Sequence, residues 1–383
     1  ASAFSRVSLV APLANVVAAP LFTLVMGIGA VATCLVPVPA LQGVALACAD
    51  VVGGVFVWAM RSLAALPLAS IPVEVGAAPA LAVAVVAAVA LLVAWPDVRG
   101  GLLAGLACGA VAVVLVVLGY WRFLSPARVC VLDVGQGDAI LVADGSAAVL
   151  VDTGPDDAVV EALARQHVYH LDAVILTHFH DDHVGGLSHL LGTVGCDRVL
   201  VAEGSADDEG SELERSILEL TGGASEELSY GDAVRVGGFS LRVVSPTTEV
   251  DGADNEDSIE LALAYDEEGE SLTGLLAGDA ERDETGAALE RGDVGDVDFL
   301  KVGHHGSEVS VTSEEAAELD PEVSVASAGE GNRYGHPSQT CVDVLEGAGS
   351  TFLCTMDVGD VTVMPGQEGP RVRVASPANL ARD

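Results

Sequence analysis

The chain of 383 residues carries a formal net charge of −38 at pH 7, because 55 aspartates and glutamates face only 17 lysines and arginines. A surface this acidic repels DNA and anionic lipid unless locally basic sites or bound cations intervene. The seven cysteines lack tight spacing, which argues against a disulfide-dense secreted scaffold.

The distribution of charged residues divides the chain into two segments of different composition. Residues 1–120 contain three arginines and three carboxylates and are strongly apolar, whereas the remainder holds the entire negative excess. We therefore expect a membrane-embedded block over residues 1–121, a linker over 122–128 and a soluble domain over 129–383. Because the chain begins at Ala1 without an initiator methionine, we expect a fragment of a longer protein or a processed product.

Uncharged stretches of the first block are long enough to cross a bilayer, which takes about 20 apolar residues. Segments 75–95 and 101–121 are the clearest predicted spans, and residues 96–100 join them as a tight hairpin. Two arginines follow the last span and weakly favour a cytoplasmic placement of that end.

Two earlier spans are less regular. One covers about residues 7–36 and is broken by two prolines. The other covers residues 42–66 and contains Asp50 and Arg61. Ionisable groups at membrane depth are costly, so we expect both side chains to face protein, a water-filled cavity or the interface.

The soluble block alternates short apolar runs with turn residues, which predicts strands with helices between them. The predicted strands lie within 129–154, where three short strands are expected, and at 171–177, 198–203, 234–246, 259–265, 272–279, 297–305 and 323–329, with a terminal pair around 351–374. Helical spacing occurs at 156–167, 184–192 and 313–319. We therefore expect a two-layered sheet core with helices outside.

The stretch THFHDDHVGG (177–186) follows a strand that is predicted to be buried. His178 and His180 are two apart, and such positions in an extended backbone face the same way, so both imidazoles can reach one cation. Asp182 and His183 follow where the chain turns and can reach a second cation beside the first. Imidazole and carboxylate suit zinc or another first-row divalent ion.

At this motif the sequence resembles the metallo-β-lactamase-fold hydrolases, over most of residues 129–365. The resemblance implies an αββα sandwich after the helical membrane segment. VLVDTG, which contains Asp152, looks like the family's first motif, and LLAGDAE supplies Asp279, which would bridge two metals. LKVGHHGS looks like the last ligand strand. There the resemblance favours His305 over His304, and neighbours on a strand point to opposite faces.

The sequence departs from the family at one ligand. The family usually supplies another histidine before the bridging aspartate, but none occurs between His189 and His304. Asp254, Asn255 or Ser258 could offer oxygen instead, and oxygen ligands shift the preference towards manganese or magnesium. We expect two divalent metal ions, zinc or manganese, with the first short of one nitrogen ligand.

A narrower resemblance is to the ComEC/Rec2 competence proteins, and it rests on DVGQGDAILV (133–142), HHGS (304–307), NRYGHPS (332–338) and SLVAPLANVVAAPLF (8–22). It implies a multi-pass DNA-uptake channel in the cell membrane, with an outward-facing hydrolase domain that degrades the strand that does not enter. Single- or double-stranded DNA, membrane lipid and other competence proteins are the implied partners. This placement conflicts with the arginine count, and the architecture is the stronger argument.

The expected chemistry is metal-assisted phosphodiester hydrolysis. The expected ligand sets are His178 and His180 for the first metal, Asp182, His183 and His305 for the second, and Asp279 as the bridge. Asp152 would orient a ligand imidazole. His336 would protonate the leaving oxygen or hold a phosphate. Asp138 would approach the metals or shape a turn, and Lys301 would face the site or form a buried ion pair.

Two other functions stay open from sequence. One is a membrane-tethered hydrolase of small esters or phosphodiesters, and the other is a transport component with a purely structural metal domain. A basic groove around Arg282, Lys301 and Arg333 would favour the nuclease, whereas an enclosed neutral pocket would favour the small-ester hydrolase. The intact metal motif weighs against a purely structural role.

Overall fold

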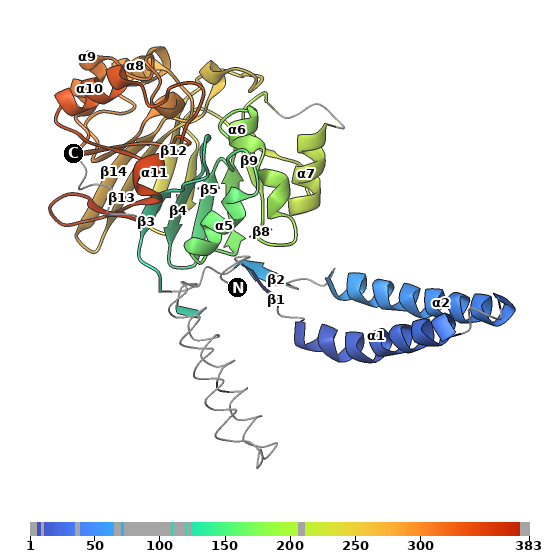
Figure 1. The fold of residues 1–383 in the computed structure, drawn as a ribbon. Helices are drawn as coiled ribbons and strands as arrows, with labels where there is room; N and C mark the ends of the chain where they lie inside the picture. The colour runs from blue at the N-terminus through green and yellow to red at the C-terminus, as the bar shows by residue number, and fades with distance from the viewer. Residues whose placement is uncertain are drawn as a thin grey trace. The chain divides into compact units, whose positions relative to one another are not determined.

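The computed structural model describes residues 6–8, 11–34, 39–64, 70–72, 109, 119–120, 124–205 and 211–375 (Figure 1). The chain divides into two compact units, residues 1–89 and 90–383. The spans predicted over 75–95 and 101–121 lie outside the described residues, apart from three positions of the second.

Two long apolar helices, α1 (Ala11–Cys34) and α2 (Pro39–Ala64), pack along one another in the first unit. Within the described residues, Leu13–Cys34 and Leu41–Leu63 are long and apolar enough to cross a membrane, judged by length and composition. The prediction that prolines break the first span is wrong, because α1 continues through Pro20. Proline is tolerated inside membrane helices where neighbouring groups satisfy the freed carbonyl.

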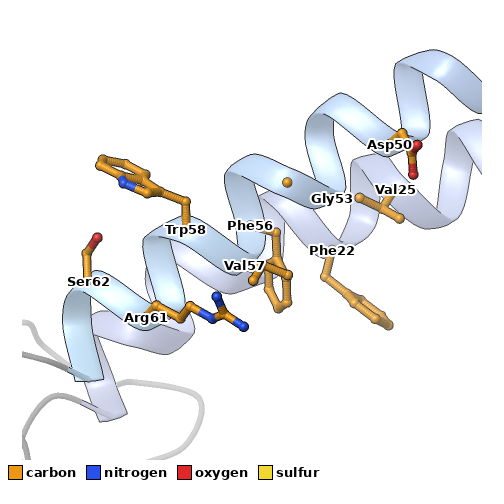
Figure 2. Close-up of a pocket in the computed structure, with 10 residues that line it drawn as sticks. Phe22, Val25, Asp50, Gly53, Phe56, Val57, Trp58, Arg61 and Ser62 are labelled. Carbon is orange, nitrogen blue, oxygen red and sulfur yellow. The ribbon is translucent and has the colours of Figure 1, made fainter.

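Beside the helices, β1 (Arg6–Ser8) pairs antiparallel with β2 (Ser70–Pro72). A pocket along the helical hairpin is lined by aromatic and aliphatic side chains of both helices, together with Asp50 and Arg61 of α2 (Figure 2). Charged groups on an apolar helix are costly in lipid, so these two remain candidates for contact with protein or water.

The second unit is built on two large sheets. The first sheet runs, in spatial order, through β10 (Glu226–Leu228), β9 (Val199–Ala202), β7 (Ala173–Ile175), β5 (Ala147–Val151), β4 (Ile140–Asp144), β3 (Arg128–Val131), β18 (Val361–Met364) and β19 (Arg371–Val374). The second runs through β11 (Ala233–Val236), β12 (Phe239–Ser245), β13 (Glu260–Glu267), β14 (Glu270–Leu276), β15 (Phe299–Lys301), β16 (Val323–Ala326) and β17 (Thr351–Cys354). A small parallel pair joins β6 (His170–Leu171) and β8 (Gly195–Cys196).

Helices cover the outer face of each sheet. The first sheet packs against α5 (Ala158–Arg165), η1 (Leu187–Leu190) and α7 (Glu212–Thr221). The second packs against α8 (Arg282–Arg291), α9 (Ser313–Leu319) and α10 (Gln339–Gly347). Short turns of helix occur at α6 (Asp181–Val184), η2 (Asn255–Asp257), η3 (Gly303–Gly306) and α11 (Thr355–Val358). The predicted αββα sandwich is confirmed (Figure 1).

The alternation of side chains along each strand explains the layering. In β5, Val149 and Val151 join the apolar core between the sheets, whereas Leu150 joins the core beneath the helices of the first sheet. Successive strand residues point to opposite faces, so a strand that is apolar throughout can be buried on both sides.

Most predicted strands are present, and three local predictions need correction. The strand predicted over 297–305 ends at Lys301, because the following residues form η3. Residues 351–374 form three strands in two sheets rather than a terminal pair. The helices α7, α8 and α10 were not predicted.

Candidate metal centre

The motif residues meet at one edge of the two sheets. The strands β5 and β7 run parallel, and so do β14, β15 and β16. Parallel strands place their carboxyl ends at the same edge, where functional residues of open sheets gather. Asp152, His178, Asp279 and His305 all follow the carboxyl ends of such strands.

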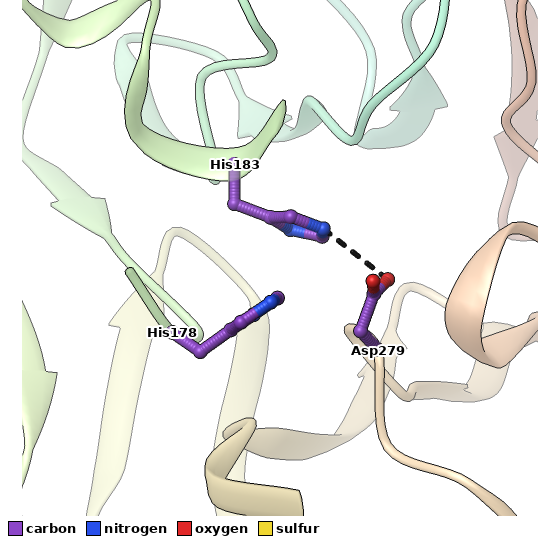
Figure 3. A group of neighbouring side chains, drawn as sticks. All are labelled: His178, His183 and Asp279. Atoms are coloured by element: carbon purple, nitrogen blue, oxygen red, sulfur yellow. Dashed lines mark ion pairs between the residues drawn. The ribbon is translucent and has the colours of Figure 1, made fainter. Parts of the chain in front are cut away.

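His178, His183 and Asp279 form the first group of possible ligands (Figure 3). One donor atom of each lies within 4.8 Å of the others. His183 Nε2 is 3.2 Å from Asp279 Oδ1, and the rings of His178 and His183 are 4.2 Å apart between centroids. All three side chains are buried.

Asp182, His183 and His305 form a second group that adjoins the first. His305 Nε2 is 3.3 Å from Asp182 Oδ2 and 3.5 Å from Asp279 Oδ1. The Asp279 oxygen therefore lies between the Nε2 atoms of His183 and His305.

The donor atoms of this cluster fit a divalent cation. His178 Nε2, His183 Nε2, His305 Nε2 and Asp279 Oδ1 are buried and have no hydrogen-bond partner among the described residues. Buried polar atoms without a partner are rare and costly, and their convergence indicates a bound ion. Imidazole nitrogen with carboxylate oxygen is a donor set for zinc or manganese.

The Nδ1 atoms of His183 and His305 each have a hydrogen-bond acceptor on the side away from the donor cluster. His183 Nδ1 is 2.7 Å from Asp152 Oδ2, and His305 Nδ1 is 3.0 Å from the carbonyl of Ser327. An acceptor at Nδ1 keeps the proton there and leaves Nε2 free to bind a metal.

His178 is oriented by hydroxyl groups instead. Its Nδ1 lies 3.2 Å from the hydroxyls of both Ser258 and Thr177. The Thr177 hydroxyl donates to Asp152, so it accepts from His178. Ser258 also accepts the backbone N–H of Asp279, which ties the two ligand loops together.

Asp152 connects the ligand loops at the centre of the site. It is fully buried, has a φ of 59° and accepts hydrogen bonds from the backbone N–H and the hydroxyl of Thr177. Burial raises the pKa of Asp152, although the neighbouring His183 opposes this shift. The structure thus places Asp152 behind a ligand imidazole.

The electrostatics favour a cation. Burial alone would lower the pKa of His183, but the carboxylates of Asp279 and Asp152 raise it well above its ordinary value. Burial likewise opposes protonation of His305, yet Asp279 and Asp138 raise its pKa to about 10. Carboxylates around imidazoles therefore create the negative potential that a divalent ion would neutralise.

Lys301, the only lysine of the chain, lies in the core rather than in a groove. Its Nζ donates to Asp138 Oδ2 over 2.7 Å and to the carbonyl of Val302 over 2.9 Å. The other oxygen of Asp138 is 3.3 Å from His305 Nδ1. Burial would raise the pKa of Asp138, but the Lys301 ammonium lowers it to about 2.

The two adjacent histidines of η3 point in different directions, although not for the predicted reason. The strand argument for them is wrong, because His304 and His305 have positive φ values of 44° and 55°. His304 Nδ1 is 3.1 Å from Glu281 Oε1, and the Asn255 amide is 3.3 Å from the His304 ring. His304 is therefore not in either group of possible ligands, whereas His305 is.

The donor cluster opens into a pocket of about 220 Å³. Its lining consists of Gln136, His180, Asp182, Asn255, Asp279, His304, His305, Tyr334 and His336. His180 is exposed, and its ring centroid is 4.6 Å from that of His178. Asp254 is exposed and caps η2.

A basic groove of Arg282, Lys301 and Arg333 does not form at this pocket. Lys301 is buried in its ion pair, and the two arginines are exposed and do not contribute to the lining. The pocket is neither basic nor neutral, because histidines and carboxylates line it.

Sequence reasoning missed several residues that the structure brings to the site. Thr177 holds Asp152 and His178, Glu281 pairs with His304, and Gln136 and Tyr334 line the pocket. One feature of the sequence could have identified them, because each lies within three residues of a site residue that was predicted.

Comparisons with known proteins find a separate family match for the apolar block and for the acidic block. The sequence matches the metallo-beta-lactamase superfamily over residues 132–329 and the competence protein family over residues 1–99. ComE operon protein 3 of Bacillus subtilis is 28% identical over 243 residues, which cover 58% of this chain and 31% of that protein. Recombination protein 2 of Haemophilus influenzae is 28% identical over 244 residues, which cover 62% of this chain and 28% of that protein.

The chain thus spans less than a third of the length of these curated relatives. Among solved structures, a putative metal-dependent hydrolase from Parabacteroides distasonis is similar at 17% identity and a TM-score of 0.37, covering 61% of this chain and 96% of that one. The chain belongs to the metallo-β-lactamase superfamily, whose family model matches residues 132–329, and its apolar block is similar to the competence protein family over residues 1–99.

Proposed function

We propose that this chain is part of a DNA-uptake channel whose metallo-β-lactamase-fold domain is a metal-dependent phosphodiesterase that degrades the strand that does not enter. The observation that carries the proposal is a cluster of four buried, unpartnered donor atoms, two of which belong to residues that line an open pocket, Asp279 and His305. We propose domain boundaries at 1–121, 122–128 and 129–383, with the multi-pass block in the cell membrane and the hydrolase domain on its outer side.

The second ion would take Asp182, His183 and His305, whose donor atoms lie within 4.8 Å of one another. Because His183 Nε2 can serve only one ion, we assign it here. Divalent ions at this site would lower the pKa of a coordinated water and neutralise charge on phosphate oxygens.

The first ion would take His178, with His180 beside it, and Asp279 would serve both ions. The exposed position of His180 leaves the first ion with the weaker set of protein ligands. Ser258 and Asn255, the expected oxygen donors, contact His178 and His304 respectively, so we assign them to orientation.

His336 would hold the leaving group. It lines the pocket, and its buried Nδ1 has no hydrogen-bond partner among the described residues. Burial and the neighbouring His304 lower the pKa of His336. The neutral imidazole can therefore donate an N–H hydrogen bond to an oxygen of the phosphodiester.

Hydrolysis of small esters or phosphodiesters is the second candidate, and one observation favours it. The pocket of about 220 Å³ is lined by neither arginine nor lysine, in a chain of net charge −38. A purely structural metal is the weaker alternative, because the donor atoms face a pocket that a substrate could enter.

The test uses the full chain in detergent with Mn²⁺ or Zn²⁺, a 5′-labelled single strand of DNA and a small phosphodiester. We expect strand cleavage by the wild type, loss in Asp279→Asn and His183→Ala, and full activity in His189→Ala, an exposed histidine outside the site. Retained cleavage in either site variant would overturn the two-metal scheme. Activity on the small phosphodiester without activity on DNA would favour a hydrolase of small substrates.

A further inference from the structure

The loop between β16 and α10 carries three planar side chains at the rim of the pocket. Tyr334 is 55% exposed, and its ring lies parallel to that of His336, at 7° and 5.8 Å between centroids. The guanidinium carbon of Arg333 is 4.8 Å from the centre of the Tyr334 ring. Aromatic residues make up only 4% of the chain, so an exposed tyrosine beside the metal cluster calls for a functional explanation.

Asn332 fixes the shape of this loop. Its Oδ1 accepts hydrogen bonds from the backbone N–H groups of Tyr334 and His336, at 3.2 and 3.0 Å. Its Nδ2 donates to the carbonyls of Gly329 and His336, at 3.0 and 2.6 Å. Because the loop is held before any ligand arrives, contact with it requires little further ordering.

The loop is also tied to the ligand histidines. The backbone N–H of Ser338 donates to the carbonyl of Gly306, at the end of η3, over 2.8 Å. Tyr334 and His336 line the same pocket as Asp279 and His305. A group that stacks on Tyr334 would therefore lie next to a phosphate held at the metal cluster.

We propose that Tyr334 is a stacking platform for an unpaired nucleobase beside the scissile phosphate, and that Arg333 binds an adjacent phosphate. This inference rests on the proposed phosphodiesterase and names its substrate as single-stranded nucleic acid. Stacking on an aromatic ring is sequence-tolerant, because every base has a π-face. A base within a duplex has both faces covered by its neighbours and cannot use the platform.

The charge of the protein makes such a contact useful. A chain with a net charge of −38 cannot rely on a broad basic face to hold a polyanion. Stacking is insensitive to that charge. The exposed Arg333, which lies against the Tyr334 ring and donates to its hydroxyl over 2.7 Å, supplies one local cation for a phosphate. The platform thus accounts for nucleic-acid selection without a basic groove.

The experiment compares a normal single strand with one in which tetrahydrofuran abasic residues replace the nucleosides, using the full chain with Mn²⁺. We expect Tyr334→Ala to lower kcat/KM on the normal strand by roughly 5- to 100-fold, since base stacking contributes at this level. The abasic strand should be cleaved slowly by the wild type and no more slowly by the variant. Tyr334→Phe keeps the ring but loses the hydrogen bond from Arg333, so it should retain clearly more activity on the normal strand than Tyr334→Ala. Tyr230→Ala, at an exposed tyrosine that does not line the pocket, should behave as wild type.

Equal slowing of both strands by Tyr334→Ala, or no slowing of either, would overturn the platform. Arg333→Gln should weaken binding of both strands alike, because it would act on phosphate. If the wild type cleaves neither strand, the phosphodiesterase proposal fails. The stacking proposal is then tested separately, by measuring the binding of both strands with fluorescence anisotropy. Tighter binding of the normal strand that is lost in Tyr334→Ala would support it, and equal binding of both strands would contradict it.

Discussion

At the scale of single residues, the ion pair of Lys301 and Asp138 explains why the only lysine of the chain is buried. We expect Lys301→Met to destabilise the protein by about 3–5 kcal/mol, because it leaves a buried carboxylate without its cation. The double variant Lys301→Met/Asp138→Asn removes both charges and should regain most of that loss. Urea unfolding of the wild type, Lys301→Met, Asp138→Asn and the double variant measures these free energies. A double variant that loses the sum of both single effects would contradict the account.

Glu260 is a second buried ionisable group, and its effect on stability depends on pH. Burial raises its pKa from 4.5 to about 8, and among the described residues its carboxylate accepts one hydrogen bond, from the Thr285 hydroxyl over 2.6 Å. The unfolded chain loses this proton at lower pH than the folded one. Stability from Glu260 is therefore present below pH 4.5 and falls by up to about 1.4 kcal/mol per pH unit towards pH 8.

Glu260→Gln removes that loss, so we expect the variant to exceed the wild type in stability at pH 8 and to match it at pH 4. Glu267→Gln, an exposed position on the same strand, is the control and should leave the pH profile unchanged. Denaturant unfolding across this range checks both variants. A parallel profile for wild type and Glu260→Gln would show that Glu260 is ionised in the folded protein.

The sequence predicted individual ligand residues better than it predicted which of them lie together at one metal. The spacing of the motif predicted His178 and His183 as ligands, the family resemblance added Asp279, and the structure brings the three together. It could not show that His183 adjoins both groups, because that depends on the packing of two sheets from distant segments. It also could not show Lys301 beside Asp138, since 163 positions separate them along the chain.

At the scale of elements, the tight turn η3 decides which histidine enters the cluster. A side chain at Gly303 would collide with the carbonyl of Ala280, so the turn packs directly on the loop that carries Asp279. We expect Gly303→Ala to cost about 1–3 kcal/mol through overpacking and to weaken metal binding. Gly295→Ala, where a side chain meets open space, is the matched control.

Thermal unfolding and metal titration measure both effects of Gly303→Ala. Wild-type metal affinity in the variant would show that η3 does not position His305. The sequence predicted an extended strand here because Phe299, Leu300 and Val302 form a short apolar run. The turn is seen in the structure from the positive φ values of His304 and His305.

At the scale of the whole molecule, the contrast between an apolar block and an acidic block is visible in composition alone, and the family matches divide the chain in the same way. The order of strands in the two sheets was not predictable, because β18 and β19 return from the end of the chain to pair beside β3. Such pairing depends on contacts between segments far apart in sequence.

The acidic surface also sets the salt dependence of strand binding. Proteins that neutralise many phosphates lose affinity steeply with salt, at about 0.7 log units per phosphate for a single strand. With Arg333 as the single arginine that we assign to phosphate, we expect a slope near −0.7 in log affinity against log salt concentration. A slope several times steeper, measured by fluorescence anisotropy, would indicate a basic face elsewhere.

The account rests most directly on the metal centre. Metal content per chain, measured by inductively coupled plasma mass spectrometry after equilibration with Mn²⁺ or Zn²⁺ and gel filtration, tests it. We predict two ions per wild-type chain, at most one in His305→Ala and fewer still in Asp279→Ala, with His189→Ala unchanged. A wild-type chain that retains no ion, or an Asp279→Ala chain that retains both, would contradict the metal centre proposed here.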